Sequence, residues 1–191
     1  MSVTDTAVLA PETHLEHVAS EVGRVAARYV RSHLGSARTA GTKSTPTDVV
    51  TETDLASESL IRKELAARCP GSTIVGEEYD DAVGSNDIRW IVDPIDGTVN
   101  FLYGLPVVSV SIAAMVGTET VAGAVVDVRS GLVFAAHRGG GARRNGTPLQ
   151  VAAPETLADA LIGTGFSYNA EVRAEQADLL TELLPVCRDI R

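Results

Sequence analysis

Aromatic residues, cysteines and long apolar runs are all scarce in this chain of 191 residues, and each scarcity excludes a class of protein. Phe, Trp and Tyr make up 4% of the residues, so a core must be built from the aliphatic part of the 45% hydrophobic content. The two cysteines, Cys69 and Cys187, lie far apart and indicate a reduced, cytoplasmic setting rather than a disulfide framework. The longest apolar stretch, Val107–Val116, is too short to span a membrane, and the N-terminus lacks the features of a signal peptide.

Basic residues are also in deficit. Lys and Arg total 16 against 25 Asp and Glu, which gives a formal net charge of -9. An acidic protein repels the phosphate backbone, so direct nucleic-acid binding is disfavoured. An anionic small substrate would need positive charge from another source, and bound divalent cations would supply it.

Two helices followed by short β-strands are predicted for most of the chain. Apolar residues recur at helical spacing over Leu15–Tyr29, and a second helix is expected from near Asp54 until Pro70 stops it. The expected strands are Thr73–Val75, Trp90–Asp93, Val107–Val116, Thr120–Val128 and Leu132–His137. Turn residues separate the last three, which favours an antiparallel meander packed under the helices.

The order of elements changes after the turn at Asn145-Gly146. Leu161–Gly165 is predicted to be a strand and Glu171–Leu184 a helix, which indicates the start of an α/β region. We therefore expect an N-terminal α+β domain over residues 1–153 and the beginning of a second, incomplete α/β domain over residues 154–191.

The most informative segment is Trp90–Phe101, WIVDPIDGTVNF. A hydrophobic strand is expected to end at Asp93, because Pro94 cannot donate a hydrogen bond to a neighbouring strand. Asp96 follows, and Gly97-Thr98 can begin a helix. Two carboxylates at a strand end beside a helix N-terminus suit hard cations and an anion, although the same residues are common in ordinary turns.

Other acidic residues occupy similar places. Glu77 and Glu78 directly follow a strand; solvation explains Glu78, whereas the nearby Asp motif favours a metal role for Glu77. Asp54 is expected to cap the second helix. Lys43 and Asp48 lie in a loop and have no role that the residues alone would assign.

Three segments in this order resemble the motif series of the inositol monophosphatase family, within the Mg2+-dependent, lithium-sensitive sugar phosphatase superfamily. They are KSTPTDVVTETD at Lys43–Asp54, VGEE at Val75–Glu78, and WIVDPIDGTVNF. The resemblance covers essentially the whole chain from the first helix onward. It implies the fold class α+β, as a layered αβαβα sandwich with helices packed on an antiparallel sheet.

The resemblance also implies which residues bind metal. Glu77, Asp93 and the Ile95 carbonyl would bind a first Mg2+. Asp93 and Asp96 would bind a second, and Glu77 would help to hold a third. The expected cofactor is therefore two to three Mg2+ ions per site.

The remaining roles concern phosphate and water. The Thr98 hydroxyl, with the Gly97 and Thr98 amides, would hold the phosphate. Thr98 would also orient the attacking water, and Glu77 would accept its proton. Asp54 would form a hydrogen bond with Thr98, and Lys43 would lie in a loop near the metals.

These roles imply a phosphatase that uses metal-activated water without a covalent intermediate. Its expected partner is a small phosphorylated polyol, first of all inositol 1-phosphate. Histidinol phosphate, a 3′-phosphonucleotide, fructose 1,6-bisphosphate and a non-catalytic binding role remain alternatives. The family's Trp-Asp motif, which supplies a further metal-binding Asp, is not among these 191 residues. We therefore expect the chain to be part of a longer protein, poorly active by itself, and a homodimer by resemblance.

Overall fold

A computed structural model of the chain describes residues 11–36, 38–42 and 49–191. The sequence-based expectations for Lys43 and Asp48 lie outside these residues. The chain divides into two compact units. The first contains the described residues up to Gly41 together with Val50–Leu149, and the second contains Gln150–Arg191 with Thr42 and Val49.

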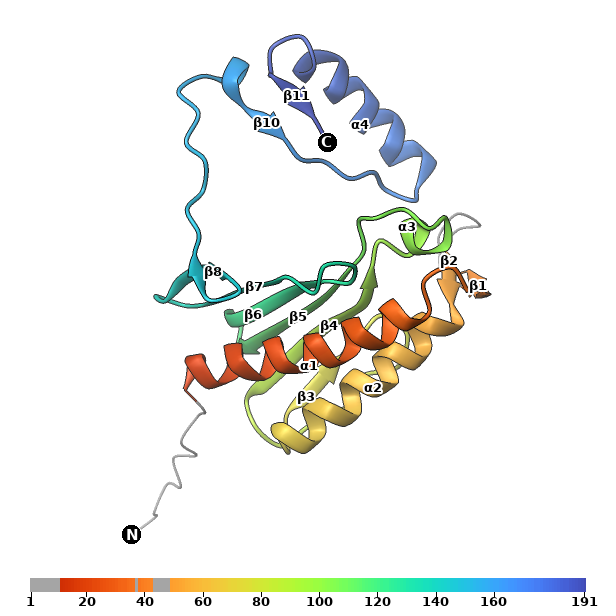
Figure 1. The fold of residues 1–191 in the computed structure, drawn as a ribbon, viewed down its shortest axis with the longest axis vertical. Coiled ribbons are helices and arrows are strands. Elements are labelled where there is room, and N and C mark those ends of the chain that lie inside the picture. Colours follow the sequence, from red (N-terminus) through yellow and green to blue (C-terminus); the bar gives the residue numbers. More distant parts are fainter. Residues whose placement is uncertain (1–10, 37, 43–48) are drawn as a thin grey trace. The chain divides into compact units, whose positions relative to one another are not determined.

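Two helices and a seven-stranded sheet make up most of the first unit (Figure 1). Its elements are α1 Glu12–Ser32, α2 Glu52–Arg68, β3 Thr73–Val75, β4 Ile88–Asp96, α3 Thr98–Leu102, β5 Ser109–Val116, β6 Glu119–Asp127, β7 Val133–His137, β8 Gly141–Arg144 and β9 Thr147–Pro148. A separate pair of short strands is formed by β1 (Thr39–Thr42) and β2 (Val49–Thr51).

The second unit is smaller and contains one long helix. Its elements are η1 Leu157–Asp159, β10 Leu161–Ile162, α4 Ala170–Leu183 and β11 Asp189–Ile190. The predicted strand and helix are present as β10 and α4, and β10 pairs in parallel with a further short strand, β11. The strand predicted over Leu161–Gly165 is only two residues long, because β11 offers it only two pairing partners.

The sheet of the first unit is mixed. β5, β6 and β7 form the antiparallel meander predicted from the sequence. β3, however, pairs with β4 in parallel, so the sheet is not antiparallel throughout. Strands joined in parallel require a crossover, and the segment between Val75 and Ile88 provides it. The α+β class predicted from the sequence is confirmed.

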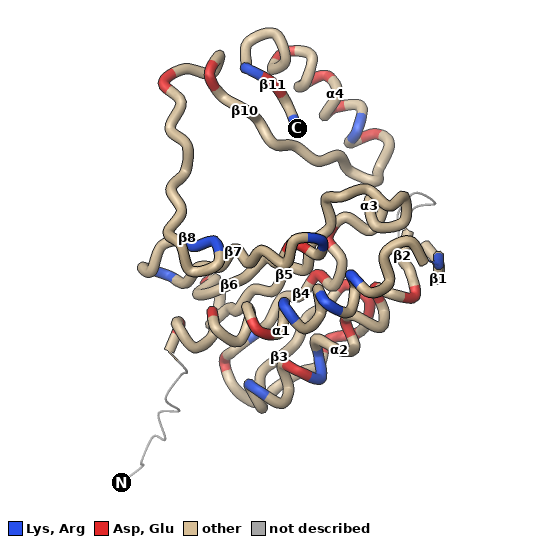
Figure 2. Tube along the Cα trace, in the orientation of Figure 1, with Lys and Arg blue, Asp and Glu red and all other residues tan. Residues whose placement is uncertain are grey.

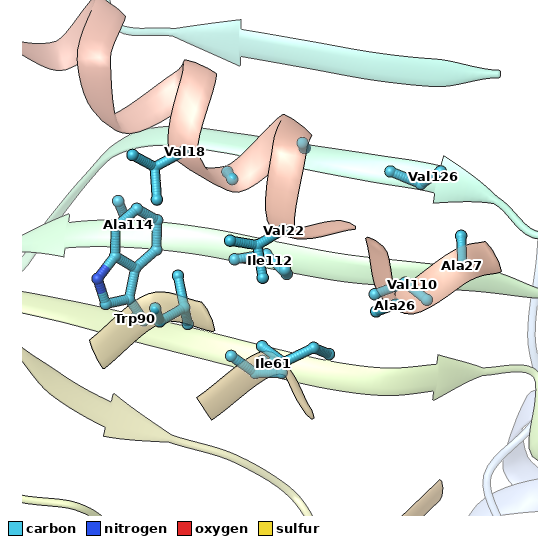
Figure 3. Packing of buried hydrophobic residues seen from close by; sticks show 14 of the residues in the cluster. Val18, Val22, Ala26, Ala27, Ile61, Trp90, Val110, Ile112, Ala114 and Val126 are labelled. Carbon is cyan, nitrogen blue, oxygen red and sulfur yellow. The ribbon is translucent and has the colours of Figure 1, made fainter. Parts of the chain in front are cut away.

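Helix α1 packs its apolar stripe on this sheet, as its periodicity predicts. Val18, Val22 and Ala26 are buried on the stripe. Figure 3 shows them facing residues of the sheet such as Ile112 and Val126. Gly23 permits this close approach, since a Cβ there would lie 2.8 Å from Val126 Cγ2. The core is therefore largely aliphatic, as the scarcity of aromatics predicts, although its two largest side chains are Trp90 and Phe101.

Polar side-chain contacts join the first half of α1 to the end of β7 and to β8. Glu16 Oε2 contacts His137 Nδ1, and Glu12 Oε1 pairs with Arg138. Arg143 Nη1 lies 4.0 Å from the same Glu16 carboxylate. These contacts hold the helix along the sheet, and the first of them joins residues that are 121 positions apart in the sequence.

Helix α2 begins two residues earlier than expected, and its cap differs from the prediction. Thr51, not Asp54, is the N-cap residue, and Asp54 occupies the third helical position. The Thr51 hydroxyl accepts from the Asp54 amide at 3.3 Å, while Asp54 Oδ2 accepts from the Thr51 amide at 2.9 Å. This reciprocal arrangement satisfies two amides at the start of the helix.

Replacing Thr51 by Ala is expected to lower the free energy of unfolding by about 1–2 kcal/mol, because the capping hydroxyl is lost. Chemical denaturation would measure the change. Ser59→Ala, at an exposed position of the same helix, should change stability by less than about 0.5 kcal/mol. Equal effects from the two substitutions would contradict the capping role.

Charged residues of both signs are interspersed along α1 and α2 (Figure 2). Among the residues that the structure describes, no helix is both long and apolar enough to cross a membrane. The two cysteines are both free thiols.

Candidate metal and phosphate site

Glu77 and Asp93 follow neighbouring parallel strands at the same end of the sheet. The last registered pair between β3 and β4 is Val75 with Ile91. Glu77 and Asp93 each lie two residues beyond this pair, so the topology brings them to one edge. Glu77 is exposed and Asp93 is half-buried.

A bulge in β4 shapes the edge next to Asp93. Asp93 pairs with Ser111, and pairing resumes only at Asp96, opposite Ser109. The strand therefore continues to Asp96 rather than ending at Asp93, with Pro94 inside the interruption. Pro94 has no amide hydrogen to give to β5, which explains why the pairing is broken there.

Side chains hold this bulge in place from two sides. Ser57 of α2 donates a buried hydrogen bond of 3.1 Å to the Pro94 carbonyl. Asp93 Oδ1 accepts from the Ile95 amide at 3.1 Å, which closes a tight turn. The turn expected as the ordinary explanation of the motif is thus present, and it fixes the Asp93 carboxylate.

Gly97 makes the change from strand to helix possible. Its φ of 91° lies in the left-handed region, and a Cβ there would lie 2.9 Å from the Val107 carbonyl oxygen. Helix α3 then begins at Thr98, as the sequence predicts. The first amides of a helix have no partner within it, so they can donate to a phosphate.

Asp54 and Thr98 are brought together from α2 and α3. The Thr98 hydroxyl lies 3.1 Å from Asp54 Oδ1 and 3.0 Å from the Ile95 carbonyl oxygen, and it can donate to either. Asp54 is only 1% exposed, and its other oxygen accepts from Thr51. Because the Asp54 carboxylate is buried and bonded to Thr51, it is a fixed acceptor for the Thr98 hydroxyl.

The other two expected metal ligands, Asp96 and the Ile95 carbonyl, differ in their exposure to solvent. Asp96 is exposed, and its Oδ2 accepts from the Ser109 hydroxyl at 3.1 Å. Ile95 is 1% exposed, and its carbonyl oxygen lies 3.0 Å from the Thr98 hydroxyl, which can donate to it. The metal role of that carbonyl stays a prediction.

The donor atoms at this edge fit Mg2+ in chemical type. All are hard oxygens, from Glu77, Asp93, Asp96 and a backbone carbonyl. Within the described part of the chain, no three acidic, His or Cys side chains already stand close enough together to form a metal-binding group. Binding of Mg2+ at this edge therefore stays a prediction.

A cysteine nucleophile is not part of this arrangement. Cys69 is buried, and burial raises the pKa of its thiol above the usual value. The thiol therefore stays protonated and unreactive at neutral pH.

The sequence profile of the inositol monophosphatase family matches residues 12–190. The chain belongs to the inositol monophosphatase family. The resemblance predicted from the three motifs is confirmed.

Members of the inositol monophosphatase family with known sequences or structures resemble the chain over most of its length. Inositol-1-monophosphatase SuhB of Mycobacterium tuberculosis is 46% identical over 158 residues, which cover 78% of this chain and 54% of that protein. The solved structure of Mycobacterium tuberculosis SuhB matches with a TM-score of 0.80 at 40% identity, over 94% of this chain and 69% of that one. The suhB protein of Bartonella henselae gives a TM-score of 0.85 at 30% identity, with the same coverage.

This chain spans about half the length of the curated inositol monophosphatase relatives that it matches. The structural matches place it in the fold of that family.

Three residues near the inositol monophosphatase motifs were not singled out from the sequence. Ser57 donates a hydrogen bond to the Pro94 carbonyl, and Ser109 donates one to Asp96. Nothing in the sequence around a serine indicates contacts of this kind. Glu58 is buried beneath the Glu77 segment. Its spacing of four residues from Arg62 on a helix is the one signal that could have found it.

Proposed function

We propose that the protein is a Mg2+-dependent phosphatase that hydrolyses inositol 1-phosphate to inositol and phosphate. The observation that carries the proposal is the Thr98–Asp54 hydrogen bond beside the carboxylates at the edge of β3 and β4. Membership of the inositol monophosphatase family and the names of the relatives support the reaction class.

Glu77, Asp93 and Asp96 would hold two to three Mg2+ ions, with the Ile95 carbonyl as a further ligand. When bound, the ions would supply Lewis-acid chemistry that stabilises charge on the attacking and leaving oxygens. This positive charge would also offset the repulsion between an anionic substrate and a protein of net charge -9.

The chain's own groups would position the phosphate and the water. The Gly97 and Thr98 amides donate to phosphate oxygens at the start of α3. When Thr98 donates its proton to Asp54, the Thr98 oxygen can accept a hydrogen bond from the attacking water. Glu77, which is exposed at the edge, accepts the proton that this water loses. Water attacks phosphorus directly as the ester P–O bond breaks, the leaving inositol oxygen takes up a proton to give the alcohol, and no covalent intermediate forms on the chain.

Phosphate release from a panel of monoesters would test the proposal. Inositol 1-phosphate is expected to be the best substrate, ahead of histidinol phosphate, a 3′-phosphonucleotide and fructose 1,6-bisphosphate. Chelation with EDTA should abolish turnover, and added Mg2+ should restore it. A strong preference for another monoester would overturn the inositol assignment, and a wild-type chain that binds no Mg2+ would overturn the assignment as a Mg2+-dependent phosphatase.

By the same resemblance, we propose a cytoplasmic homodimer that is inhibited by Li+. Light scattering on the purified chain would measure the oligomeric state.

A further inference from the structure

Glu58 of α2 is a carboxylate that is withdrawn completely from solvent, and the chemistry proposed above gives it no role. Its side chain is 0% exposed. Burying a carboxylate is unfavourable unless hydrogen bonds and an opposite charge replace the lost water. The partners of Glu58 therefore show what the buried charge holds together.

Both oxygens of Glu58 are engaged. Oε1 accepts from Arg62 Nε at 2.8 Å and lies 2.7 Å from Arg62 Nη2. Oε2 accepts from the backbone amide of Glu78 at 2.8 Å. One oxygen thus binds the helix's own arginine, and the other binds the peptide that joins Glu77 to Glu78.

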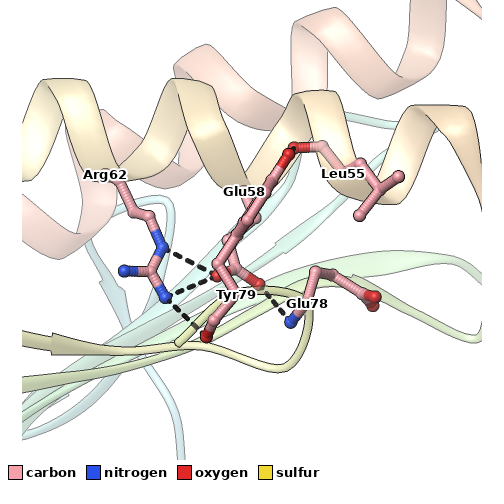
Figure 4. Close-up of polar contacts among 5 residues, drawn as sticks. All are labelled: Leu55, Glu58, Arg62, Glu78 and Tyr79. Atoms are coloured by element: carbon pink, nitrogen blue, oxygen red, sulfur yellow. Dashed lines mark hydrogen bonds and ion pairs between the residues drawn. The ribbon is translucent and has the colours of Figure 1, made fainter. Parts of the chain in front are cut away.

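The arginine extends the connection by one residue. Arg62 Nη2 donates to the Tyr79 carbonyl at 3.1 Å, and its guanidinium carbon lies 5.7 Å from the centre of the Tyr79 ring. The Tyr79 hydroxyl donates back to the Leu55 carbonyl of α2 at 3.3 Å. Figure 4 shows the five residues with the carboxylate of Glu58 between the arginine and the Glu78 amide.

Gly76 completes the enclosure on the other side of Glu77. A Cβ on Gly76 would lie 2.1 Å from Glu58 Oε1 and 2.6 Å from Oε2. The backbone at Gly76 therefore packs directly on the carboxylate, and any larger residue would displace it. Glu58 touches the chain both before and after Glu77.

We propose that Glu58 is a positioning residue for the metal site, which fixes the backbone of Gly76–Tyr79 so that the Glu77 carboxylate faces Asp93. The inference rests on the proposed function, in which Glu77 binds Mg2+. Glu77 itself is exposed, whereas the backbone on either side of it is anchored to α2. Because the backbone of Glu77 is fixed before the cation binds, the residue loses less conformational entropy on binding, which raises the affinity for Mg2+.

Glu58→Gln tests the proposal, because it keeps the size of the side chain and removes its charge. The Mg2+ dissociation constant, measured by titration calorimetry on the full chain, is expected to rise about tenfold to a hundredfold. The Mg2+ concentration for half-maximal phosphate release should rise in parallel, while turnover at saturating Mg2+ falls much less. Circular dichroism and the melting temperature report separately on the fold.

Glu64→Gln is the matched control. Glu64 forms the same type of pair with Arg68, four residues further along α2, with Nη2 3.0 Å from Oε2. Neither residue is bonded to the Glu77 segment, so Mg2+ affinity should stay unchanged. If Glu58→Gln fails to fold, Arg62→Lys replaces it. The lysine keeps the charge opposite Glu58 but loses the guanidinium that bridges Glu58 and the Tyr79 carbonyl, and a severalfold rise in the Mg2+ dissociation constant is expected.

The outcomes separate the two proposals. A folded Glu58→Gln or Arg62→Lys variant that binds Mg2+ as tightly as the wild type would overturn the positioning role and leave the metal site intact. A lower melting temperature with unchanged Mg2+ affinity would also overturn the positioning role, because such a result shows that Glu58 only stabilises the fold. A wild-type chain that binds no Mg2+ would overturn the proposed function and this inference with it.

Discussion

Replacing Asp93 by Asn is expected to lower phosphate release at least about a hundredfold and to weaken Mg2+ binding by a similar factor. Asn keeps the shape of the side chain and an oxygen that can accept from the Ile95 amide, so the turn should persist. The negative charge is lost, and a neutral amide oxygen is a poorer ligand for Mg2+ than a carboxylate. Initial rates at several Mg2+ concentrations, together with calorimetry, would measure both effects.

Asp87→Asn provides the comparison for this substitution. Asp87 is an exposed carboxylate directly before the same strand, and the change removes one charge without touching the edge of the sheet. Activity and Mg2+ affinity should stay within about twofold of the wild type, as expected for a surface charge. Wild-type behaviour of Asp93→Asn would show that the metal site lies elsewhere.

Trp90→Ala is expected to have the largest effect on stability, a loss of about 3–5 kcal/mol in the free energy of unfolding. Trp90 is 0% exposed and lies in β4 only three residues before Asp93. Its removal would leave a cavity between α1, α2 and the sheet, as the packing in Figure 3 indicates. Such a loss is a large part of the stability of an ordinary domain.

Urea denaturation would measure the loss, with Tyr103→Ala as the control. Tyr103 is 76% exposed, so its truncation should change the free energy of unfolding by less than about 0.5 kcal/mol. A change below about 1 kcal/mol for Trp90→Ala would show that the site collapses around the smaller residue and that this ring is not central to the core.

Local patterns predicted much of the fold. The apolar spacing in α1 predicted its buried face, and the turns between β5, β6 and β7 predicted their antiparallel order. The parallel pairing of β3 with β4 was not predicted, because it is set by a crossover and not by any residue in a three-residue strand. The short β10 was overestimated for a related reason, since its length depends on a distant partner.

The candidate site was predicted unevenly. The sequence placed Asp93 and Asp96 beside the start of α3, and the family resemblance implied the Asp54–Thr98 bond that the structure contains. The cap of α2 was assigned to Asp54, although Thr51 is the N-cap and Asp54 its reciprocal partner. The burial of Glu58 could not be predicted, because it depends on how the Gly76–Tyr79 segment folds over α2. Metal and catalytic roles remain predictions for each residue.

The pairing of Glu16 with His137 has a consequence for synthesis on the ribosome. The two residues are 121 positions apart, and at translation rates of about 5–20 residues per second the histidine follows the glutamate by roughly 6–24 s. Helix α1 packs mainly on β5 and β6, so its apolar stripe, which includes Leu15, Val18 and Val22, can be buried only after these strands have been made. Until then the stripe is exposed apolar surface on the nascent chain, and the contact with His137 forms later still.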